Sequence, residues 1–356
     1  MKKQQECELI RKTSVGGEAL IEGIMMRGPK GSAVACRLPD GEIETEFLEY
    51  QPISAKTKFF KIPIIRGFVI FIDSMLLGYK ALMLSAEKQG LDDEEIQQEE
   101  LSKFDKWLLD HFGDKVMSIV STIGMVLGIV LAFFLFFWMP TFLFQFFSAG
   151  AAKGFGWVFQ NFGLMFSKGE VLNAVLAASV LAPFKALFEG VLRMIIFILY
   201  ILLISRMKDI QRVFQYHGAE HKTIFCYEKG LPLTVENVKK QIRFHPRCGT
   251  SFIFMILILS ILFSTLLSYI LPDVIVQTRM LWIAIKILLL PFMMGVGYEL
   301  IKYAGKHDNL FVRIVSAPGL WMQRLTTREP SENAIIEIGI ASLKAVITDN
   351  PEDDTL

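Results

Sequence analysis

The stretch CGTSFIFMILILSILFSTLLSYILP, Cys248 to Pro272, decides the fold class of this chain. It contains 25 residues and no charged side chain, and a helix needs only about 20 apolar residues to cross the hydrocarbon core of a bilayer. Hydrophobic residues make up 53% of the chain and its mean hydropathy is +0.44, more apolar surface than one soluble domain of this length needs to bury. The sequence therefore predicts an integral membrane protein.

Three further stretches are candidate spans. Val116 to Ala152 is uncharged over 37 residues, and we expect Pro140 to kink or end its helix. Met280 to Tyr298 is interrupted only by Lys286, whereas Val171 to Ser205 contains charged residues four positions apart on one helical face. These charged residues are Lys185, Glu189 and Arg193. We expect them to face other helices or the interface and to pair with one another.

The distribution of lysine and arginine predicts how the chain crosses the membrane. Met1 to Lys115 contains 16 of these residues and Arg206 to Arg247 contains nine. The loop after the first span has only Lys153 and Lys168, and the loop after the third has only Arg279. The polar N-terminus also lacks the apolar core of a signal peptide. We therefore expect four spans, with both termini and the 206–247 segment on the cytoplasmic side.

Two regions outside the spans have recognisable patterns. Gly16 to Tyr50 contains two alternating runs joined by PDG, which predicts a small cytoplasmic β subdomain. Downstream, Arg66, Asp73 and Lys80 recur every seven residues on an otherwise apolar helix, which we expect to lie in the membrane interface or along the spans. Near the C-terminus, Ser331 is placed to cap a second amphipathic helix.

These features divide the chain into six segments. They are a cytoplasmic β-rich subdomain (1–60), an interfacial amphipathic helix with an acidic linker (61–114), spans one and two (115–205), a cytoplasmic loop (206–249), spans three and four (250–303), and a cytoplasmic C-terminal segment with an amphipathic helix (304–356). The four cysteines, Cys7, Cys36, Cys226 and Cys248, would then lie in a reducing compartment or at its membrane edge. We expect free thiols or metal ligands rather than disulfides.

The stretch QYHGAEHKTIFCYE, residues 215–228, contains the pattern H-x-x-E-H at His217, Glu220 and His221. On a helix, histidines four residues apart lie on one face and can bind one zinc ion, while the glutamate polarises a water molecule as a general base. Glu228 falls on nearly the same face. Gly218 weakens this helix by about 1 kcal/mol relative to alanine. The pattern is short, and its residues could equally form salt bridges with the basic side chains around them.

A further ligand could come from several places. FHPRCGTSF supplies His245 and Cys248, and Pro246 favours a turn that would direct both towards the histidine pair. Glu228 is a third source and Glu299, at the end of the fourth span, is a fourth. If cysteine and histidine filled all four positions, the metal would be structural and no position would remain for water. No stretch resembles a phosphate-binding glycine loop, a serine nucleophile elbow or a nucleic-acid-binding module.

Five motifs, in their order and spacing, resemble the YqhQ-like family of bacterial membrane proteins, a domain family of unknown function described as predicted metal-dependent enzymes. They are SVGGEALIEGIMMRGP, YHGAEHKTIFCYE, HPRCGTSF, YELIKYAG and PGLWMQRLTTREP, and they extend from about Val15 to Val346. The resemblance implies a multi-pass protein of the bacterial inner membrane. It also implies signature polar positions at His217, Glu220, His221, His245 and Cys248.

Two functions from different classes remain open. In the first, the protein is a metal-dependent hydrolase that cleaves a peptide or lipid-linked bond near the membrane surface. His217 and His221 bind a divalent metal, with zinc the best match, and Glu220 is the general base. In the second, the protein is a non-catalytic scaffold or assembly factor that binds lipid headgroups or a membrane-protein partner. A transporter is a third reading, which rests only on the charged residues within the spans.

Overall fold

The computed structural model describes residues 12–90, 126–144, 146–147, 185–272, 278–307 and 309–355. The chain forms two compact units. Unit 1 comprises the described residues of Met1–Lys106, Ile201–Met255 and Met294–Leu356, and unit 2 comprises those of Trp107–Tyr200 and Ile256–Met293. Three long helices run from one unit into the other: α7 (Lys185–Ile204), α10 (Gly249–Ile270) and α12 (Arg279–Lys306).

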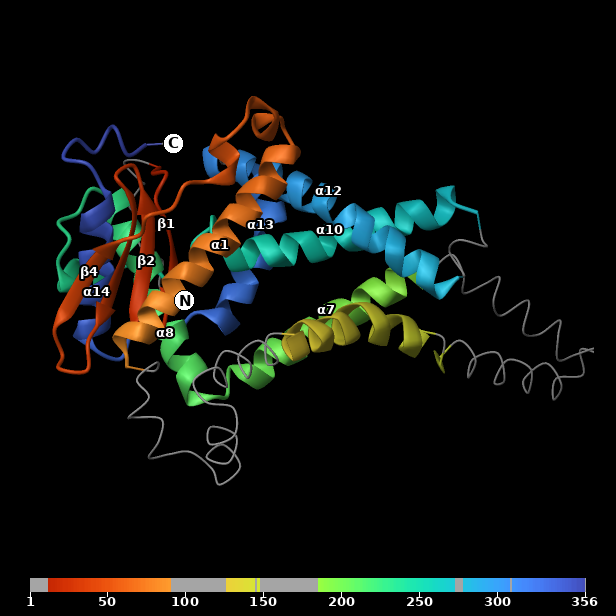
Figure 1. The fold of residues 1–356 in the computed structure, drawn as a ribbon, viewed down its shortest axis with the longest axis horizontal. Coiled ribbons are helices and arrows are strands. Elements are labelled where there is room, and N and C mark those ends of the chain that lie inside the picture. The colour runs from red at the N-terminus through yellow and green to blue at the C-terminus, as the bar shows by residue number, and fades with distance from the viewer. Residues whose placement is uncertain are drawn as a thin grey trace, which may run out of the picture. The chain divides into compact units, whose positions relative to one another are not determined.

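Unit 1 is built on a four-stranded antiparallel sheet with the order β1-β2-β3-β4 (Figure 1). Its strands are β1 (Gly16–Leu20), β2 (Gly23–Gly28), β3 (Gly31–Arg37) and β4 (Ile43–Phe47). The predicted PDG turn joins β3 to β4, and its Gly41 has a φ of +94°, which favours glycine. The predicted N-terminal β structure is therefore confirmed.

Helices cover both faces of this sheet (Figure 1). They are α1 (Ile65–Lys88) on one face, and α8 (Lys208–Glu228) and α14 (Asn333–Val346) on the other. The core towards α8 and α14 includes Ile24, Met26, Ala33, Ala35, Tyr216, Ala219, Ile336 and Leu343. The core towards α1 includes Met25, Val34, Cys36, Leu77 and Ala81. Burial on two faces explains why β2 and β3 are apolar at consecutive positions rather than at alternate ones.

The helix that the sequence places in the membrane interface is α1, and its polar stripe has a structural use. Asp73 is only 1% exposed. Its carboxylate accepts hydrogen bonds from the Tyr50 hydroxyl at 2.7 Å and from the backbone N–H groups of Ile53 and Ser54 at 2.7 and 3.1 Å. Asp73 thus fastens the chain between β4 and α1, which contains short 3-10 turns at Ile53–Ala55 and Lys58–Lys61.

Five described helices are long and apolar enough to cross a membrane. They are Ile65–Lys88, Val126–Phe144, Ala186–Ile204, Gly249–Ile270 and Met280–Lys306. The last four fall within or overlap the four spans expected from the sequence, and the first is α1. Residues 116–125, 148–152 and 171–184 of the expected spans lie outside the described residues. The mostly helical architecture with a small sheet is confirmed.

The first of the four expected spans continues past Pro140 instead of ending there. A π-helical turn, Phe134–Trp138, lies just before the proline. Because proline has no N–H, the carbonyl of Phe136, four residues earlier, lacks its usual helical donor. In unit 2 the Arg193 guanidinium supplies one, with its Nε 2.7 Å from that oxygen.

Two charged residues of the α7 stripe, Glu189 and Arg193, form hydrogen bonds with neighbouring helices. The Glu189 carboxylate accepts hydrogen bonds from the Lys286 ammonium and from the Trp282 indole N–H at 3.2 Å, both on α12. Arg193 donates to the Ser260 hydroxyl at 2.9 Å. The side chain of Lys185 lies outside the described residues. Interhelical pairing of this kind reduces the cost of charges within an apolar layer.

The C-terminal helix begins later than the sequence predicts. Glu332 occupies the N-cap position of α14, so the expectation that Ser331 caps it is wrong. The Ser331 hydroxyl instead donates to the side-chain oxygen of Gln215 at 2.7 Å, which ties the loop to α8. Unit 1 also contains the short α9 (Val235–Lys239) and the amphipathic α13 (Leu310–Thr326).

Candidate metal centre

The H-x-x-E-H residues lie on α8, which is helical through Gly218 and buried from there to its C-terminal residue. A Cβ atom at Gly218 would lie 1.9 Å from the backbone oxygen of Arg328. Glycine therefore allows the chain after α13 to contact α8, and this packing offsets its poor helix propensity. His217, Glu220 and His221 share the side of α8 that this contact helps to enclose.

Three of the expected ligands come together. Candidate ligand atoms of His217, His221 and Cys248 all lie within 4.8 Å of one another. His217 Nε2 is 3.2 Å from the Cys248 sulfur, and the two imidazole centroids are 4.5 Å apart. Cys248 immediately precedes α10. Two histidines four positions apart and a cysteine 27 and 31 positions after them thus form one compact donor group, which we call the HHC group.

Backbone carbonyl groups orient both imidazoles. His217 Nδ1 is 2.8 Å from the oxygen of Thr326, and His221 Nδ1 is 2.5 Å from the oxygen of Arg243. A carbonyl oxygen only accepts hydrogen bonds, so each Nδ1 carries the proton when the ring is neutral. In the neutral ring, the form that binds a metal, each Nε2 then keeps its lone pair, whereas a protonated His217 donates from Nε2 to the Cys248 sulfur. Histidines that bind metals in proteins are commonly held in this way through the other ring nitrogen.

Glu220 lies beside the HHC group and is only 3% exposed. One of its carboxylate oxygens is 3.4 Å from His221 Nε2. β1 covers it closely, because a Cβ at Gly17 would lie 2.7 Å from Glu220 Cγ. Burial and the negative charge of Cys248 raise the pKa of Glu220, although the two histidines oppose the shift. A raised pKa makes an ionised carboxylate a stronger base.

The neighbours of Cys248 favour the ionised form of its thiol. Burial opposes ionisation, but the charges of His217 and His221 and their hydrogen bonds lower the pKa of Cys248 well below its ordinary value. Burial also disfavours the charged form of His217, yet Cys248 raises the pKa of that imidazole to about 9. The Thr250 hydroxyl lies 3.2 Å from the sulfur. Only the thiolate form of cysteine is a nucleophile or metal ligand.

His245 and Glu228, also expected as ligands, form a neighbouring cluster instead. Glu228 accepts hydrogen bonds from the backbone N–H and hydroxyl of Thr13, at 2.8 and 3.0 Å, and from the Arg247 guanidinium. His245 Nε2 is 3.5 Å from Glu228. The ring centroid of His245 is 5.6 Å from that of His221, so the cluster lies next to the HHC group without being part of it.

The ionisation of this cluster follows from its partners. Despite its burial, the pKa of Glu228 is lowered to about 2 by its hydrogen bond with His245 and by the charge of Arg247. Burial lowers the pKa of His245 to about 4, although its hydrogen bond with Glu228 favours a higher pKa. The pair therefore consists of an ionised carboxylate and a neutral imidazole at neutral pH. Its described contacts account for both residues structurally.

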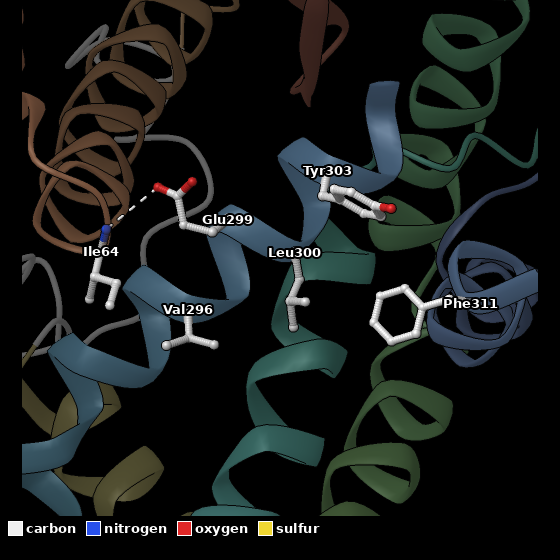
Figure 2. A pocket seen from close by; sticks show the side chains of 6 residues that line it. All are labelled: Ile64, Val296, Glu299, Leu300, Tyr303 and Phe311. Carbon is white, nitrogen blue, oxygen red and sulfur yellow. Dashed lines mark hydrogen bonds between the residues drawn. The ribbon is translucent and has the colours of Figure 1, made fainter. Parts of the chain in front are cut away.

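Glu299, the remote carboxylate considered from sequence, contacts other residues. It forms a bidentate ion pair with Arg66 at 2.6 and 2.5 Å. Figure 2 shows its side chain turned towards the backbone nitrogen of Ile64, at the edge of an apolar pocket. Glu299 thus links α12 to the start of α1.

One residue near the centre was missed by the pattern of histidines. Glu18 on β1 is exposed, and its carboxylate lies against Gly78 of α1, where a Cβ would be 2.4 Å from Oε2. Partial burial and the charge of Glu220 raise the pKa of Glu18, while His217 opposes this effect. The motif SVGGE contains Glu18 and Gly17, so the signal was present in the sequence. The carbonyl acceptors Thr326 and Arg243 carry no side-chain signal.

Comparisons with known proteins agree with the resemblance drawn from the motifs. The model of the family described as "Protein of unknown function (DUF1385)" matches residues 62–349. The chain is 32% identical over 338 residues to a protein of Bacillus subtilis (strain 168) described as "Uncharacterized protein YqhQ", with 93% of this chain and 92% of the relative covered. No solved structure matches.

Proposed function

The chain belongs to this YqhQ-like family of unknown function, and from its site we propose that it is a metal-dependent hydrolase of the bacterial inner membrane. In this proposal the HHC group binds a divalent cation, with zinc preferred because imidazole and thiolate are its usual ligands. Glu220 is the general base. The substrate carries a peptide or lipid-linked bond close to the membrane surface.

One observation carries the proposal: both histidines of the HHC group donate from Nδ1 to backbone carbonyls and keep Nε2 beside a thiolate. Two imidazoles with fixed orientation and a thiolate form a preorganised donor set of three. In catalytic zinc sites three protein ligands leave a fourth position open. A cation at this position would act as a Lewis acid on the bond to be cleaved.

The residues around the HHC group supply the remaining chemistry. Glu220, with its raised pKa, takes a proton from the attacking water and returns it to the leaving group. The backbone N–H of Gly17 faces the same carboxylate and holds it in place. Burial of His221, Glu220 and Cys248 keeps the dielectric constant low, which strengthens each of these interactions.

Metal analysis of the full-length protein tests the binding step. We expect about one zinc per chain after purification in detergent without chelator, and a loss of at least tenfold in the His217→Ala, His221→Ala double variant. His307→Ala is the matched control, because His307 is an exposed histidine that stacks on Tyr303. Equal zinc in the double variant and the control would contradict the proposal.

The Glu220→Gln variant tests catalysis separately. It preserves the shape of the side chain but cannot accept a proton, so we expect zinc to be retained and cellular function to be lost. The control is Glu337→Gln on α14, an exposed glutamate. Full function in Glu220→Gln with zinc retained would favour the non-catalytic scaffold, in which a bound metal only stabilises the fold.

The contact between Cys248 and His217 supports a second candidate, a thiol nucleophile activated by an imidazole. The distance of 3.2 Å and the lowered pKa of Cys248 are what such a pair requires. Chelation separates the two candidates. Function that survives removal of metal but is abolished by alkylation of Cys248 would favour the nucleophile, whereas function restored by added zinc would favour the metal centre.

The proposed membrane orientation keeps both termini and the centre on the cytoplasmic side, as the lysine and arginine distribution suggests. Labelling from each side of the membrane tests it. Cys226 is fully buried and unsuited to labelling, so Lys240→Cys, at an exposed position after α9, is the better probe. Reaction with an impermeant thiol reagent from the periplasmic side would contradict this orientation.

A further inference from the structure

The outward face of α13 is apolar. Leu310, Ile314 and Trp321 are 73%, 63% and 47% exposed, and Ala317 is exposed between them. These four residues are spaced by four, three and four positions, so they form a single stripe along the helix. We call them the α13 stripe. A helix of a soluble domain normally turns such a stripe inwards.

The inward face of α13 is already occupied by unit 1. Val312, Gly319, Met322, Gln323 and Thr326 are buried. A Cβ at Gly319 would lie 2.6 Å from Ser251 Cβ, which shows that α13 packs closely on the first turn of α10. Rotation of α13 would expose the face that now packs on unit 1, so it would not bury the α13 stripe without this loss. The α13 stripe requires an apolar environment outside this part of the chain.

Chain connectivity shows which environment is nearest. α13 begins at Leu310, four residues after α12 ends, and α10 and α12 are both candidate spans. The helix thus lies where described segments enter and leave an apolar layer. Exposed basic residues border the stripe and the end of α12: Lys302, Lys306, Arg313 and Arg324. Cations with long apolar stems beside an apolar stripe suit a membrane surface that contains anionic lipids.

An apolar pocket of about 540 Å³ continues from the stripe. It is lined by Ile64, Val296, Glu299, Leu300, Tyr303 and Phe311 (Figure 2). Phe311, next to the stripe on α13, is 53% exposed and forms one wall. Glu299 is the carboxylate that lines the pocket, and its ion pair with Arg66 neutralises its charge. The pocket therefore suits a hydrocarbon chain rather than a polar ligand.

We infer that α13 lies in the interfacial layer of the bilayer, with the α13 stripe among the acyl chains and the chain of a phospholipid in the pocket beside Phe311. The inward face of the same helix provides Thr326, whose carbonyl orients His217, and Gln323. The side-chain amide of Gln323 accepts from the backbone N–H of His245 at 2.7 Å and donates to its carbonyl at 2.6 Å. One face of α13 thus contacts the membrane, and its opposite face contacts the residues in and beside the HHC group.

A fluorescent label on the stripe tests this inference. Full-length protein with Ala317→Cys and Cys7→Ser, labelled with an NBD fluorophore, is reconstituted in nanodiscs of mixed phosphatidylcholine and phosphatidylglycerol. The control carries the label at Asp349→Cys, which is fully exposed. We expect a blue-shifted emission and strong quenching by doxyl-labelled phospholipid for the stripe label, and quenching by aqueous iodide for the control. Equal melting temperatures in detergent show that both proteins are folded.

Two results would overturn the inference. Quenching of the stripe label by iodide, as in the control, would place α13 in water. A label that neither quencher reaches would mean that protein, from another chain or from elsewhere in this one, covers the stripe. Neither result depends on the bound metal or on activity, so the inference can fail while the proposed function stands, and the reverse.

The pocket is tested by a phospholipid that carries a photoreactive diazirine at the end of one acyl chain. We expect crosslinks to peptides that contain Val296 to Phe311, and a reduction of at least fivefold in the Leu300→Trp variant, which fills the pocket. Leu288→Trp is the control, since Leu288 is 80% exposed on the same helix and lies outside the pocket. Equal crosslinking in both variants would exclude the pocket as the lipid site.

Discussion

Gly218 shows how one residue places the candidate centre. Alanine is the better helix former by about 1 kcal/mol, and a helix-propensity argument alone would favour it at this position. The Arg328 carbonyl, however, occupies the space that a Cβ would need. The same stretch of chain supplies the Thr326 carbonyl that orients His217. Glycine at position 218 lowers the helix propensity of α8, but the close contact with Arg328 requires it.

We predict that Gly218→Ala destabilises the protein by about 1 to 3 kcal/mol, the usual cost of forcing extra atoms into a packed contact. Zinc content should fall with stability, because movement of the chain at Arg328 disturbs the nearby Thr326. The control is Gly128→Ala, since a Cβ at Gly128 meets no heavy atom of the described residues within 4 Å. Thermal unfolding in detergent measures both. A Gly218→Ala protein as stable as the control would contradict the packing argument.

The cluster of Glu228 and His245 predicts a loss of stability in acid. The pKa of Glu228 is about 2 in the folded protein against an ordinary 4.5, so its contribution is lost as the pH falls from 4.5 towards 2. The pKa of His245 is about 4 against 6.5, so the unfolded chain binds the extra proton as the pH falls from 6.5 to 4. Both groups therefore act in the same direction.

Unfolding measured between pH 7 and pH 4 should show a falling melting temperature that begins near pH 6.5. In His245→Gln the decline between pH 6.5 and 4 should be weaker, because the titrating imidazole is absent. His307→Gln, at an exposed position, is the control and should follow the parent protein. A pH profile that is unchanged in His245→Gln would show that another group governs this decline.

Among the elements, α7 and α12 are joined by buried charges. Glu189 is fully buried, Lys286 is 4% exposed, and the two form an ion pair. Removing one partner of such a pair leaves an uncompensated charge, whereas replacing both by uncharged groups of similar shape is much less costly. The energetic role of the pair is therefore visible only when single and double variants are compared.

We predict that Lys286→Met destabilises the protein by about 3 kcal/mol or more, and that Lys286→Met with Glu189→Gln recovers most of this loss. Lys302→Met is the control, because Lys302 is exposed on the same helix. The measurement is the melting temperature in detergent. A double variant that is as unstable as the single variant would show that the lysine acts through packing rather than through charge compensation.

The elements also show what a sequence can and cannot reveal. Apolar runs predict the long helices because the bilayer imposes a length, and the PDG turn predicts the β3-β4 hairpin because its geometry is local. From sequence, Asp73 is expected in a surface stripe. The backbone N–H groups that bind its carboxylate come from a loop about 20 residues away, so no local pattern reveals them. From sequence, Ser331 is expected to cap a helix, but its hydroxyl donates a long-range hydrogen bond to Gln215.

The same distinction holds within the candidate centre. His217 and His221 are paired by helix geometry, so sequence spacing brings them together. Cys248 and His245 are only three residues apart in sequence, and only tertiary packing decides that the thiol joins the pair while the imidazole contacts Glu228. Backbone carbonyls, which orient both histidines, are available at every residue. Sequence therefore gives no means of choosing Thr326 or Arg243 among them.

For the whole molecule, unit 1 is assembled from three stretches of chain separated by the residues of unit 2. Contacts between distant segments close it. Thr13 binds Glu228, and the backbone N–H of Ser14 donates to the Asp354 carbonyl at 2.8 Å. The Asp354 carboxylate accepts from the Tyr227 hydroxyl and from Thr348, whose N–H and hydroxyl are 3.0 and 2.8 Å away. Segments near residue 13 and residue 354 thus meet at the end of α8.

We predict that Asp354→Ala destabilises unit 1 by about 1 to 3 kcal/mol, because donors on buried Tyr227 and on partly buried Thr348 lose their acceptor. Its neighbour Asp353 is exposed, so Asp353→Ala is a matched control that should leave the melting temperature within about 1 °C of the parent. Hydrogen exchange at the end of α8 should quicken in the first variant only. Identical behaviour of the two variants would remove Asp354 from the closing contacts.

The position of α14 has a consequence for biosynthesis. The strands emerge from the ribosome first, but one face of their sheet is covered by α14, some three hundred residues later. Until Val346 has been made, the apolar positions of the sheet that α14 covers lack that cover while the intervening apolar helices are synthesised. We therefore expect a chain that stops short of α14 to be degraded, because one face of its sheet stays without that helix.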